Sequence, residues 1–264
     1  MEALLEIKDL VAGYPSFFLK DINLSVSKGD FCGIIGPNGS GKTTLLKTIS
    51  GLIRPAKGKI YLKGKEIKEI PRKEFARSIA SVSQEPPQED LRAEEYVLLG
   101  RIPHFRRFQF FETPRDRELA LKCMELTGVL HLKDRIVGEL SSGERQLLFI
   151  ARGLAQEPEM LLLDEPVAHL DIAHQIQVMD LLKRLNSELG LTMLIVLHDL
   201  NLAGEYCERL ILLKEGSIYR CGTPSEVITY QTIEEVYRTV VIVRENPLSK
   251  KPFVLPVPSR YIRV

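Results

Sequence analysis

One stretch of the chain, GPNGSGKTT at residues 36–44, has the residue types and spacing of a phosphate-binding loop. It follows an apolar run, FCGII, and precedes a helical pattern that reaches about Ser50. Glycines let backbone N–H groups approach phosphates, and the helix start adds a favourable dipole. We expect Lys42 to reach the β- and γ-phosphates of a nucleotide and the Thr43 hydroxyl to hold Mg²⁺. The residues expected to bind nucleotide here are Gly36, Pro37, Asn38, Gly39, Ser40, Gly41, Lys42, Thr43 and Thr44.

Two adjacent carboxylates follow a second apolar run, in MLLLDEP at residues 160–166. A buried parallel strand would deliver Asp164 to the carboxyl edge of the sheet, where open α/β sheets bind ligands. Asp164 is suited to Mg²⁺, and Glu165 to orienting a water for attack on the γ-phosphate. A plain solvated turn is the alternative for this motif alone.

A second candidate anion-binding turn lies at LSSGERQ, residues 140–146. Two serines and a glycine stand at the start of an apolar helical pattern, which is what an anion-binding helix start needs. This turn has no lysine to complete the site.

Three further residues are candidates on weaker grounds. His198 ends another buried run, LTMLIVL, but a histidine there is also typical of a structural turn. Gln84 follows the strand-like IASVS and could contact Mg²⁺ or the attacking water. Tyr14 could stack on adenine, or could equally be a core or edge aromatic.

The elements that must position these residues follow two patterns. Alternating apolar and polar residues before residue 30, and again at 59–62, predict a small antiparallel sheet. Continuous apolar runs that alternate with helices predict a mostly parallel sheet covered on both faces, so the fold class is α/β. A helix after residue 171 is expected to bury a stripe of apolar side chains, namely Ile172, Ile176, Met179, Leu182, Leu185 and Leu189.

Residues 85–140 differ from the sheet-forming parts of the chain, because prolines separate several short helical patterns there. Thr113 followed by proline predicts a helix start, and that helix should end near Gly128. Thr223 in TPSE predicts a capping box. We therefore expect a nucleotide-binding domain at 1–222 with a helical insertion at about 85–140, and a short extension at 223–264.

Composition excludes several classes. The net charge of +1 over 264 residues does not suggest a nucleic-acid partner. Four scattered cysteines without a CxxC pair argue against a disulfide framework or zinc site and favour a reducing cytosol. The first residues do not resemble a signal peptide, and no run approaches the ~18 apolar residues of a membrane span.

The order of these motifs resembles the nucleotide-binding cassette of ABC ATPases over residues 1–222. The resemblance implies that Tyr14 stacks on adenine, that Gln84 senses the γ-phosphate and His198 contacts it, and that Glu165 acts on the water. It also implies a head-to-tail homodimer, in which LSSGE of one copy caps the ATP held by the other. By resemblance the nucleotide-binding set therefore gains Ser141, Ser142, Gly143, Glu144 and, from AHLD, Asp171.

The chain departs from the family pattern at three positions. The signature motif of the family usually reads Leu-Ser-Gly-Gly-Gln. In this chain Ser142 replaces the first glycine and Glu144 replaces the glutamine. The turn can still form if Ser142 tolerates its backbone angles. Val167 stands where a small hydroxyl residue is common.

Several short segments narrow the resemblance to ATPases of importers for ferric siderophores, haem and cobalamin: GRIPH, HDLNLA and the closing CGTPSEVIT and ENPLSKKPFVLPV. This subfamily implies a peripheral subunit at the cytoplasmic face of the membrane. Its partners would be two polytopic permease subunits and, indirectly, a substrate-binding protein. The alternatives are the ATPase of a different importer and a soluble ABC ATPase that acts on ribosomes or DNA.

Overall fold

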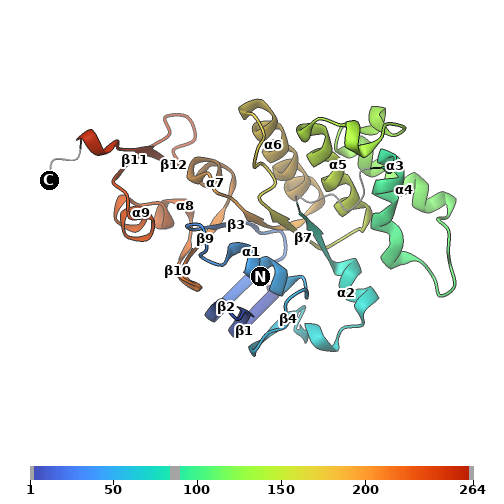
Figure 1. The fold of residues 1–264 in the computed structure, drawn as a ribbon, viewed down its shortest axis with the longest axis horizontal. Coiled ribbons are helices and arrows are strands. Elements are labelled where there is room, and N and C mark those ends of the chain that lie inside the picture. The colour runs from blue at the N-terminus through green and yellow to red at the C-terminus, as the bar shows by residue number, and fades with distance from the viewer. Residues whose placement is uncertain (1–2, 84–89, 262–264) are drawn as a thin grey trace. The chain divides into compact units, whose positions relative to one another are not determined.

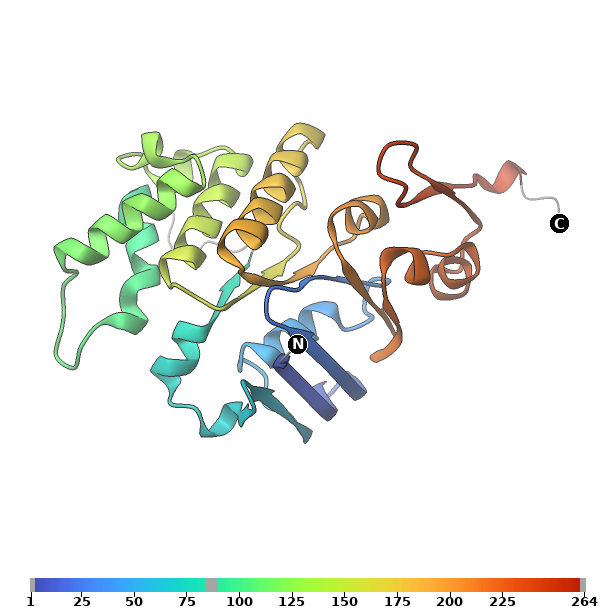
Figure 2. The same cartoon turned by 180° about the vertical axis from the view of Figure 1, so that it is seen from behind.

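The computed structural model describes residues 3–83 and 90–261, drawn as ribbons in Figures 1 and 2. The chain divides into two units, which are described separately. The first unit combines the chain up to Glu66 with the chain from Leu194 onward, and the second runs from Ile67 to Met193.

An antiparallel sheet opens the first unit, in the strand order β2-β1-β4-β5. The strands are β1 (Ala3–Tyr14), β2 (Phe17–Ser27), β4 (Lys57–Leu62) and β5 (Lys65–Glu66). Leu5 and Ile7 of β1 are buried opposite Leu62 and Ile60 of β4. The alternating pattern therefore buries one face, and the predicted sheet is confirmed.

The first unit also contains the strand that leads into the phosphate-binding pattern. All of β3 (Phe31–Ile35) is buried, and it pairs in parallel with β9 (Arg209–Lys214), which pairs antiparallel with β10 (Ser217–Gly222). Helices α1 (Lys42–Ile49) and α7 (Leu200–Tyr206) belong to the same unit. The uninterrupted apolar sequence of β3 is what burial on both faces requires.

The last forty residues or so also fold within the first unit. They form α8 (Pro224–Val227), α9 (Tyr230–Tyr237), the antiparallel pair β11 (Val241–Glu245) and β12 (Pro252–Pro256), and a short 3₁₀ turn, η5 (Ser259–Tyr261). The Thr223 capping box forms as predicted. The Asn201 side chain fixes β12 to α7 by two hydrogen bonds with the Val254 backbone, of 2.7 and 3.2 Å. The division at residue 222 stays a prediction.

The second unit is mainly helical around two parallel strands, β6 (Ile79–Val82) and β7 (Met160–Asp164). Helices α3, α4 and α5 pack against one another, and Figure 2 shows α5 and α6 from behind. Thr113 caps α4 as predicted, and α4 ends two residues before Gly128. The helices are η1 (Ile67–Glu69), α2 (Arg72–Ser78), α3 (Ala93–Leu98), η2 (Leu99–His104), α4 (Pro114–Leu126), η3 (Leu130–Leu132), η4 (Val137–Glu139), α5 (Ser142–Ala155) and α6 (Ile172–Leu189).

The boundary between the units falls within β8 (Thr192–Val196), a fully buried strand. Its first residue donates a hydrogen bond to the Glu159 carbonyl in the second unit. Leu197, directly after it, donates to the Ile34 carbonyl of β3 in the first unit.

The predicted apolar stripe of α6 is wrong at both ends of the helix. Met179, Leu182 and Leu185 are buried, but Ile172 is 76% exposed and Leu189 is 56% exposed. Ile176 is exposed as well. Periodicity identifies the face of a helix that can be buried, but the length of helix that is covered depends on its neighbours, and only the middle of α6 is covered in its unit.

The sequence has no run long and apolar enough to predict a membrane-spanning helix. Within residues 3–83 and 90–261, no helix combines the length and the apolar character needed to cross a bilayer.

Candidate functional site

The loop between β3 and α1 has a backbone that only glycine can adopt at two positions. Gly36 has φ +147°, and a Cβ there would lie 2.3 Å from the Leu213 carbonyl oxygen. Gly41 has φ +104°, and its Cβ would lie 2.7 Å from Leu19 and 2.9 Å from the Phe17 ring. Any larger side chain would therefore displace the loop from the strand and hairpin behind it.

Lys42 begins α1 and its side chain lies across this loop. It is 5% exposed, and its Nζ donates hydrogen bonds to the Gly36 carbonyl at 2.8 Å and the Pro37 carbonyl at 3.1 Å. Among the described residues, the buried Ser40 Oγ has no hydrogen-bond partner. A hydroxyl donor, an ammonium and a helix start thus converge on one loop, and this donor set fits a phosphate group.

Tyr14 lies beside the same loop because of the β1–β2 hairpin. Tyr14 ends β1 opposite Phe17, the first residue of β2, and the Phe17 ring approaches Gly41. Tyr14 is 45% exposed, so its ring is available for stacking. The sequence did not single out Phe17, whose part in shaping the loop depends on this tertiary contact.

Tyr237 is a second residue that the sequence analysis missed. It ends α9, and the backbone of Gly36 hydrogen-bonds its phenol. Burial raises the pKa of Tyr237 to about 12, so the phenol is neutral near pH 7. A cleft of about 300 Å³ separates this end of α9 from the phosphate-binding loop, lined by residues that include Asn38 and Arg238.

His198 also belongs to the first unit and is exposed two residues after the end of β8. The next residue, Asp199, caps α7 by accepting hydrogen bonds from the Asn201 and Leu202 amides at 2.7 and 3.0 Å. The cap fixes the backbone on which His198 is carried.

Asp164 and Glu165 lie in the second unit, where the sequence placed them: at the end of β7 and directly after it. Both are half-buried. Glu165 has φ +53°, a left-handed conformation that costs a non-glycine residue about 1 kcal/mol. Backbone strain of this kind persists where the surrounding structure enforces it, and it concentrates at functional sites.

The second candidate anion-binding turn, residues 141–144, also lies in this unit and forms a complete helix N-cap. Ser141 Oγ accepts from the Glu144 amide at 3.3 Å, while the Glu144 carboxylate accepts from the Ser141 amide at 2.8 Å and from its hydroxyl at 2.7 Å. These hydrogen bonds hold the pKa of Glu144 below its usual range. Ser142 begins α5 and is not among the residues with positive φ, so the replacement of glycine there introduces no left-handed strain.

Gly143 lets the turn approach the start of α6. A Cβ on Gly143 would lie 2.4 Å from the His174 ring. That ring is held in turn by Asp171, whose two carboxylate oxygens each lie 2.9 Å from His174 Nδ1. Hydrogen bonds to the His174 backbone and ring keep the pKa of Asp171 low. The sequence-predicted Ser141 turn and Asp171 therefore belong to one cluster, and His174 joins them.

The structure thus groups the candidates in two sets. Tyr14, the 36–44 loop and His198 lie in the first unit, and Asp164, Glu165, the 141–144 turn and Asp171 lie in the second. Gln84 lies outside the described residues.

A glycine loop between a buried parallel strand and a helix, with a lysine across it, defines the class of phosphate-loop nucleotide-binding domains. Comparison with known proteins narrows this class. The family model described as ABC transporter matches residues 19–168, which is more than half of the chain. The chain belongs to the ABC transporter family, and its cassette is an ATP-binding ATPase domain.

Among curated relatives, the chain is 41% identical over 257 residues to the ferric enterobactin transport ATP-binding protein FepC of Escherichia coli, covering 97% of this chain and 94% of the relative. It is 39% identical to the iron(3+)-hydroxamate import ATP-binding protein FhuC of Bacillus subtilis, covering 95% and 94%. It is also 39% identical to the hemin import ATP-binding protein HmuV of Gloeobacter violaceus, covering 92% and 90%.

Solved structures agree with this assignment. One, described as "an inward-facing conformation of a putative metal-chelate type ABC transporter", superposes with a TM-score of 0.85 at 27% identity, covering 98% of this chain and 100% of the other. The ATP-binding cassette MJ0796, in a dimeric post-hydrolysis state bound to ADP and Pi, superposes with a TM-score of 0.72 at 31% identity, covering 83% and 98%. The predicted α/β fold with a mostly parallel sheet and an antiparallel sheet is confirmed.

Proposed function

We propose that this chain is the energy-coupling ATPase subunit of an importer for an iron chelate, with haem or cobalamin as the alternative cargo. Two copies would close head to tail around two ATP molecules, and hydrolysis would reopen them. Each cycle of closing and reopening would drive the membrane subunits to which the copies are attached.

The observation that carries the proposal is the second anion-type turn. Ser141 is exposed at the N-cap of α5, Asp171 is exposed at the N-cap of α6, and the turn is already folded without a lysine of its own. A site of this kind can cap a phosphate that another group already holds. If Lys42 of the other copy holds that phosphate, the turn needs no second lysine. The dimeric state of the similar cassette MJ0796 supports this arrangement.

Within each site the roles follow from residue chemistry. The loop amides and Lys42 bind the phosphates, and Tyr14 stacks on the adenine. Glu165 orients the attacking water, and His198 and Gln84 respond to the γ-phosphate. The oxygen donors proposed for Mg²⁺ are those of Thr43, Gln84 and Asp164, which is the donor chemistry this ion prefers; the bound ion neutralises phosphate charge.

The cargo is proposed from the relatives. FepC carries the name of a ferric enterobactin transporter and FhuC that of a ferric hydroxamate importer, and the similar solved transporter is described as metal-chelate type. HmuV is named for hemin import, which keeps haem as an alternative. This ATPase would not touch the cargo itself.

The proposed partners are two polytopic permease subunits, to which this chain would attach at the cytoplasmic face of the membrane, and, through them, a substrate-binding protein. The related import proteins are named as ATP-binding components, which implies separate membrane components. The net charge of +1 gives no support to a nucleic-acid partner.

Co-purification in mild detergent tests this function. A Glu165→Gln chain, which should retain ATP because water activation is lost, is expected to bring down a polytopic membrane protein in an ATP-dependent amount. Wild-type chain with ADP is the matched control. Capture of ribosomes or DNA in place of a membrane protein would point to the soluble class of ABC ATPases and refute the transport assignment.

A further inference from the structure

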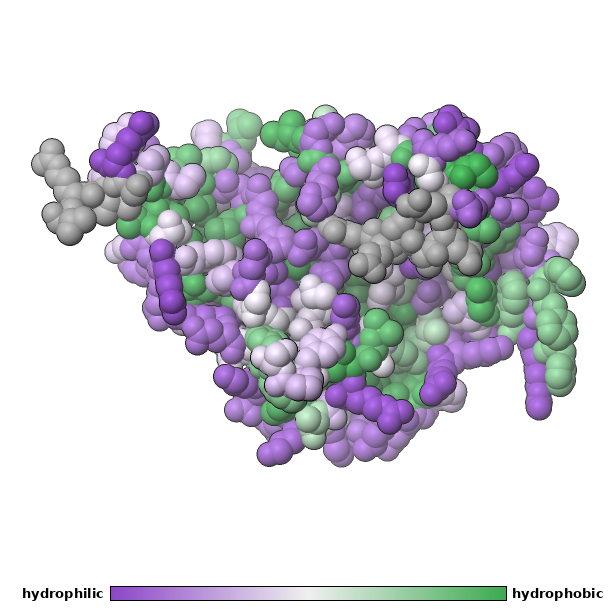
Figure 3. All heavy atoms as spheres, viewed as in Figure 1, coloured by the Kyte–Doolittle hydropathy of each residue, from purple (hydrophilic) through white to green (hydrophobic). Residues whose placement is uncertain are grey.

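The segment between η2 and α4, residues 105–112, exposes three aromatic side chains. Phe108 is 78% exposed, Phe110 81% and Phe111 80%. In Figure 1 this segment extends away from the helices of its unit, and in Figure 3 apolar atoms gather at the same place. Exposed apolar residues are common singly, but a cluster this dense on a protruding segment indicates a surface that binds something.

Hydrogen bonds within the segment hold it in a defined turn. The Gln109 amide donates to the Arg106 carbonyl at 3.1 Å, and the Gln109 side chain accepts from the Arg106 amide and donates to the Phe111 carbonyl, each at 2.9 Å. Phe108 has φ +68°, which is costly for an aromatic residue. The turn therefore holds the three phenylalanines outward at a cost in free energy.

The base of the turn is fixed to the unit as well. Lys73 donates to the Phe105 carbonyl at 2.8 Å, and Arg77 donates to the Pro103 carbonyl at 3.0 Å. A His104 ring nitrogen lies 2.9 Å from the Gln156 carbonyl oxygen.

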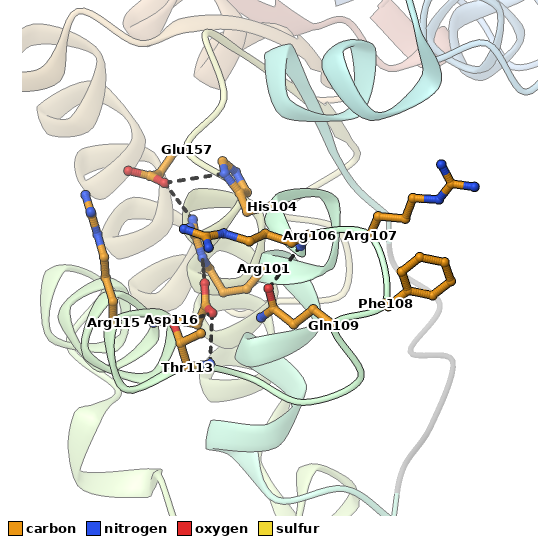
Figure 4. A pocket seen from close by; sticks show the side chains of 10 residues that line it. All are labelled: Arg101, His104, Arg106, Arg107, Phe108, Gln109, Thr113, Arg115, Asp116 and Glu157. Carbon is orange, nitrogen blue, oxygen red and sulfur yellow. Dashed lines mark hydrogen bonds and ion pairs between the residues drawn. The ribbon is translucent and has the colours of Figure 1, made fainter.

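The turn and the start of α4 carry positive charge that no ion pair neutralises among the described residues. Arg106, Arg107 and Arg115 are exposed, and across residues 3–83 and 90–261 none of the three forms an ion pair. Arg107 lies over the Phe108 ring at 5.3 Å, and Figure 4 shows the two side chains next to each other at one end of the neighbouring hollow, which both help to line. The only acid in the segment itself is Glu112.

The acids in that hollow do not neutralise these arginines. It measures about 670 Å³, and on its wall the buried Arg101 pairs with Asp116 at 3.1 Å and Glu157 at 2.7 Å (Figure 4). Because Arg101 occupies both carboxylates, Arg106 and Arg115 remain on the hollow's rim as excess positive charge.

We propose that the 105–112 turn binds the surface of a bilayer that contains anionic phospholipid. Arg106 and Arg107 would meet headgroup phosphates, while Phe108, Phe110 and Phe111 would enter the interfacial layer beneath them. Interleaved cationic and aromatic residues are the composition that favours this layer. A protein partner would need a pocket matched to the protruding rings, whereas a bilayer interface accepts them without one. The contact would be additional to the permease attachment and does not depend on it.

Flotation of the full chain with vesicles tests the proposal. We expect binding to phosphatidylcholine vesicles that contain phosphatidylglycerol and little binding to phosphatidylcholine alone. Raising the salt from about 0.1 M to about 1 M, which shortens the Debye length from about 10 Å to about 3 Å, should release most of the protein. Arg106→Gln/Arg107→Gln should weaken binding on the order of twentyfold, since each basic residue near such a surface contributes about fivefold.

A separate variant tests the three phenylalanines, and a matched control accompanies both the arginine variant and the phenylalanine variant. Phe108→Ser/Phe110→Ser/Phe111→Ser should weaken vesicle binding at least about tenfold. The controls Lys28→Gln/Lys57→Gln and Leu52→Ser/Leu248→Ser change exposed residues elsewhere and should leave it within about twofold. All variants should keep wild-type ATPase activity in solution, which shows that they fold.

Three results would overturn the proposal. Wild-type chain could bind both vesicle types equally, or neither. The turn variants could bind anionic vesicles as well as the controls do. Finally, the turn variants could still bind vesicles but no longer co-purify with a membrane protein in detergent, or no longer self-associate. Either result would assign the turn to a protein partner.

Discussion

Replacing Gly143 by alanine tests the contact between the 141–144 turn and the start of α6. The new Cβ would lie 2.4 Å from His174 Cδ2 and 3.0 Å from Cγ and Nε2. Carbon atoms in ordinary contact are about 3.5 Å apart or more, so the imidazole must move by about 1 Å. Its two 2.9 Å contacts with Asp171 would then exceed hydrogen-bonding distance.

The cost to stability should be modest and the cost to activity large. The Asp171–His174 pair is exposed, so water competes for its hydrogen bonds, and its loss should lower the melting temperature by no more than a few degrees. A displacement of about 1 Å in a site that must close on a phosphate can lower turnover by about 10- to 100-fold. ATP binding to a single copy should change by less than about twofold, because the 36–44 loop is untouched.

Steady-state ATPase assays over a range of protein concentrations would measure this, with calorimetry for stability. His174→Ala removes the ring that the new methyl group meets, so Gly143→Ala/His174→Ala should be more active than the sum of the two single defects predicts. Gly153→Ala is the matched control in the same helix: its Cβ would meet Leu161 and Val82 at 3.1 Å, away from the turn. Strictly additive effects of the two substitutions would refute the proposed contact.

Three other side chains, in the phosphate-binding loop, behind it and in a buried ion pair, can be tested by substitution. Lys42→Ala should weaken ATP binding at least about tenfold in a fluorescent-nucleotide titration, with the circular dichroism spectrum unchanged; unaltered affinity would remove the lysine from the site. Tyr237→Phe, which loses the hydrogen bond to the loop, should raise KM for ATP several-fold with a smaller change in kcat, and Tyr237→Ala should do more; equal kinetics in all three proteins would make the contact incidental. Burial opposes ionisation of Asp116, yet hydrogen bonds from Thr113 and Arg101 lower its pKa. The ionised Asp116 carboxylate therefore stabilises the folded state fully above the unfolded pKa, and this stabilisation is lost as pH falls through the folded pKa. Asp116→Asn should lower the free energy of unfolding in urea by about 2 kcal/mol at pH 7. The difference between variant and wild type should become smaller as the pH is lowered.

Local patterns in the sequence predicted what contiguous residues determine. The phosphate-binding loop formed between β3 and α1, and the helix starts predicted at Thr113 and Thr223 formed, each with a hydroxyl residue and an acid three positions apart. In each case the partner groups lie within one turn of chain, so no tertiary knowledge was needed.

Contacts between distant segments could not be predicted in this way. Tyr237 supports Gly36 from the far end of the chain, and nothing in the local sequence of α9 identifies its partner. His174 lies against Gly143 only because α5 and α6 start side by side. The stripe of α6 extended in the sequence to Ile172, which the fold leaves exposed. Periodicity carries no information about where a neighbouring element ends.

If the 141–144 turn of one copy completes the ATP site of another, two defective chains should restore one intact site when they are mixed. Both carry Glu165→Gln, so that ATP is retained; one also carries Lys42→Ala and the other Ser141→Arg. In a head-to-tail pair, both defects fall in one site and the second site has an intact Lys42 and an intact Ser141. Gel filtration with ATP should then show monomers for each chain alone and a dimer with retained nucleotide for the mixture. A mixture that stays monomeric while the Glu165→Gln chain alone dimerises would contradict this head-to-tail pairing.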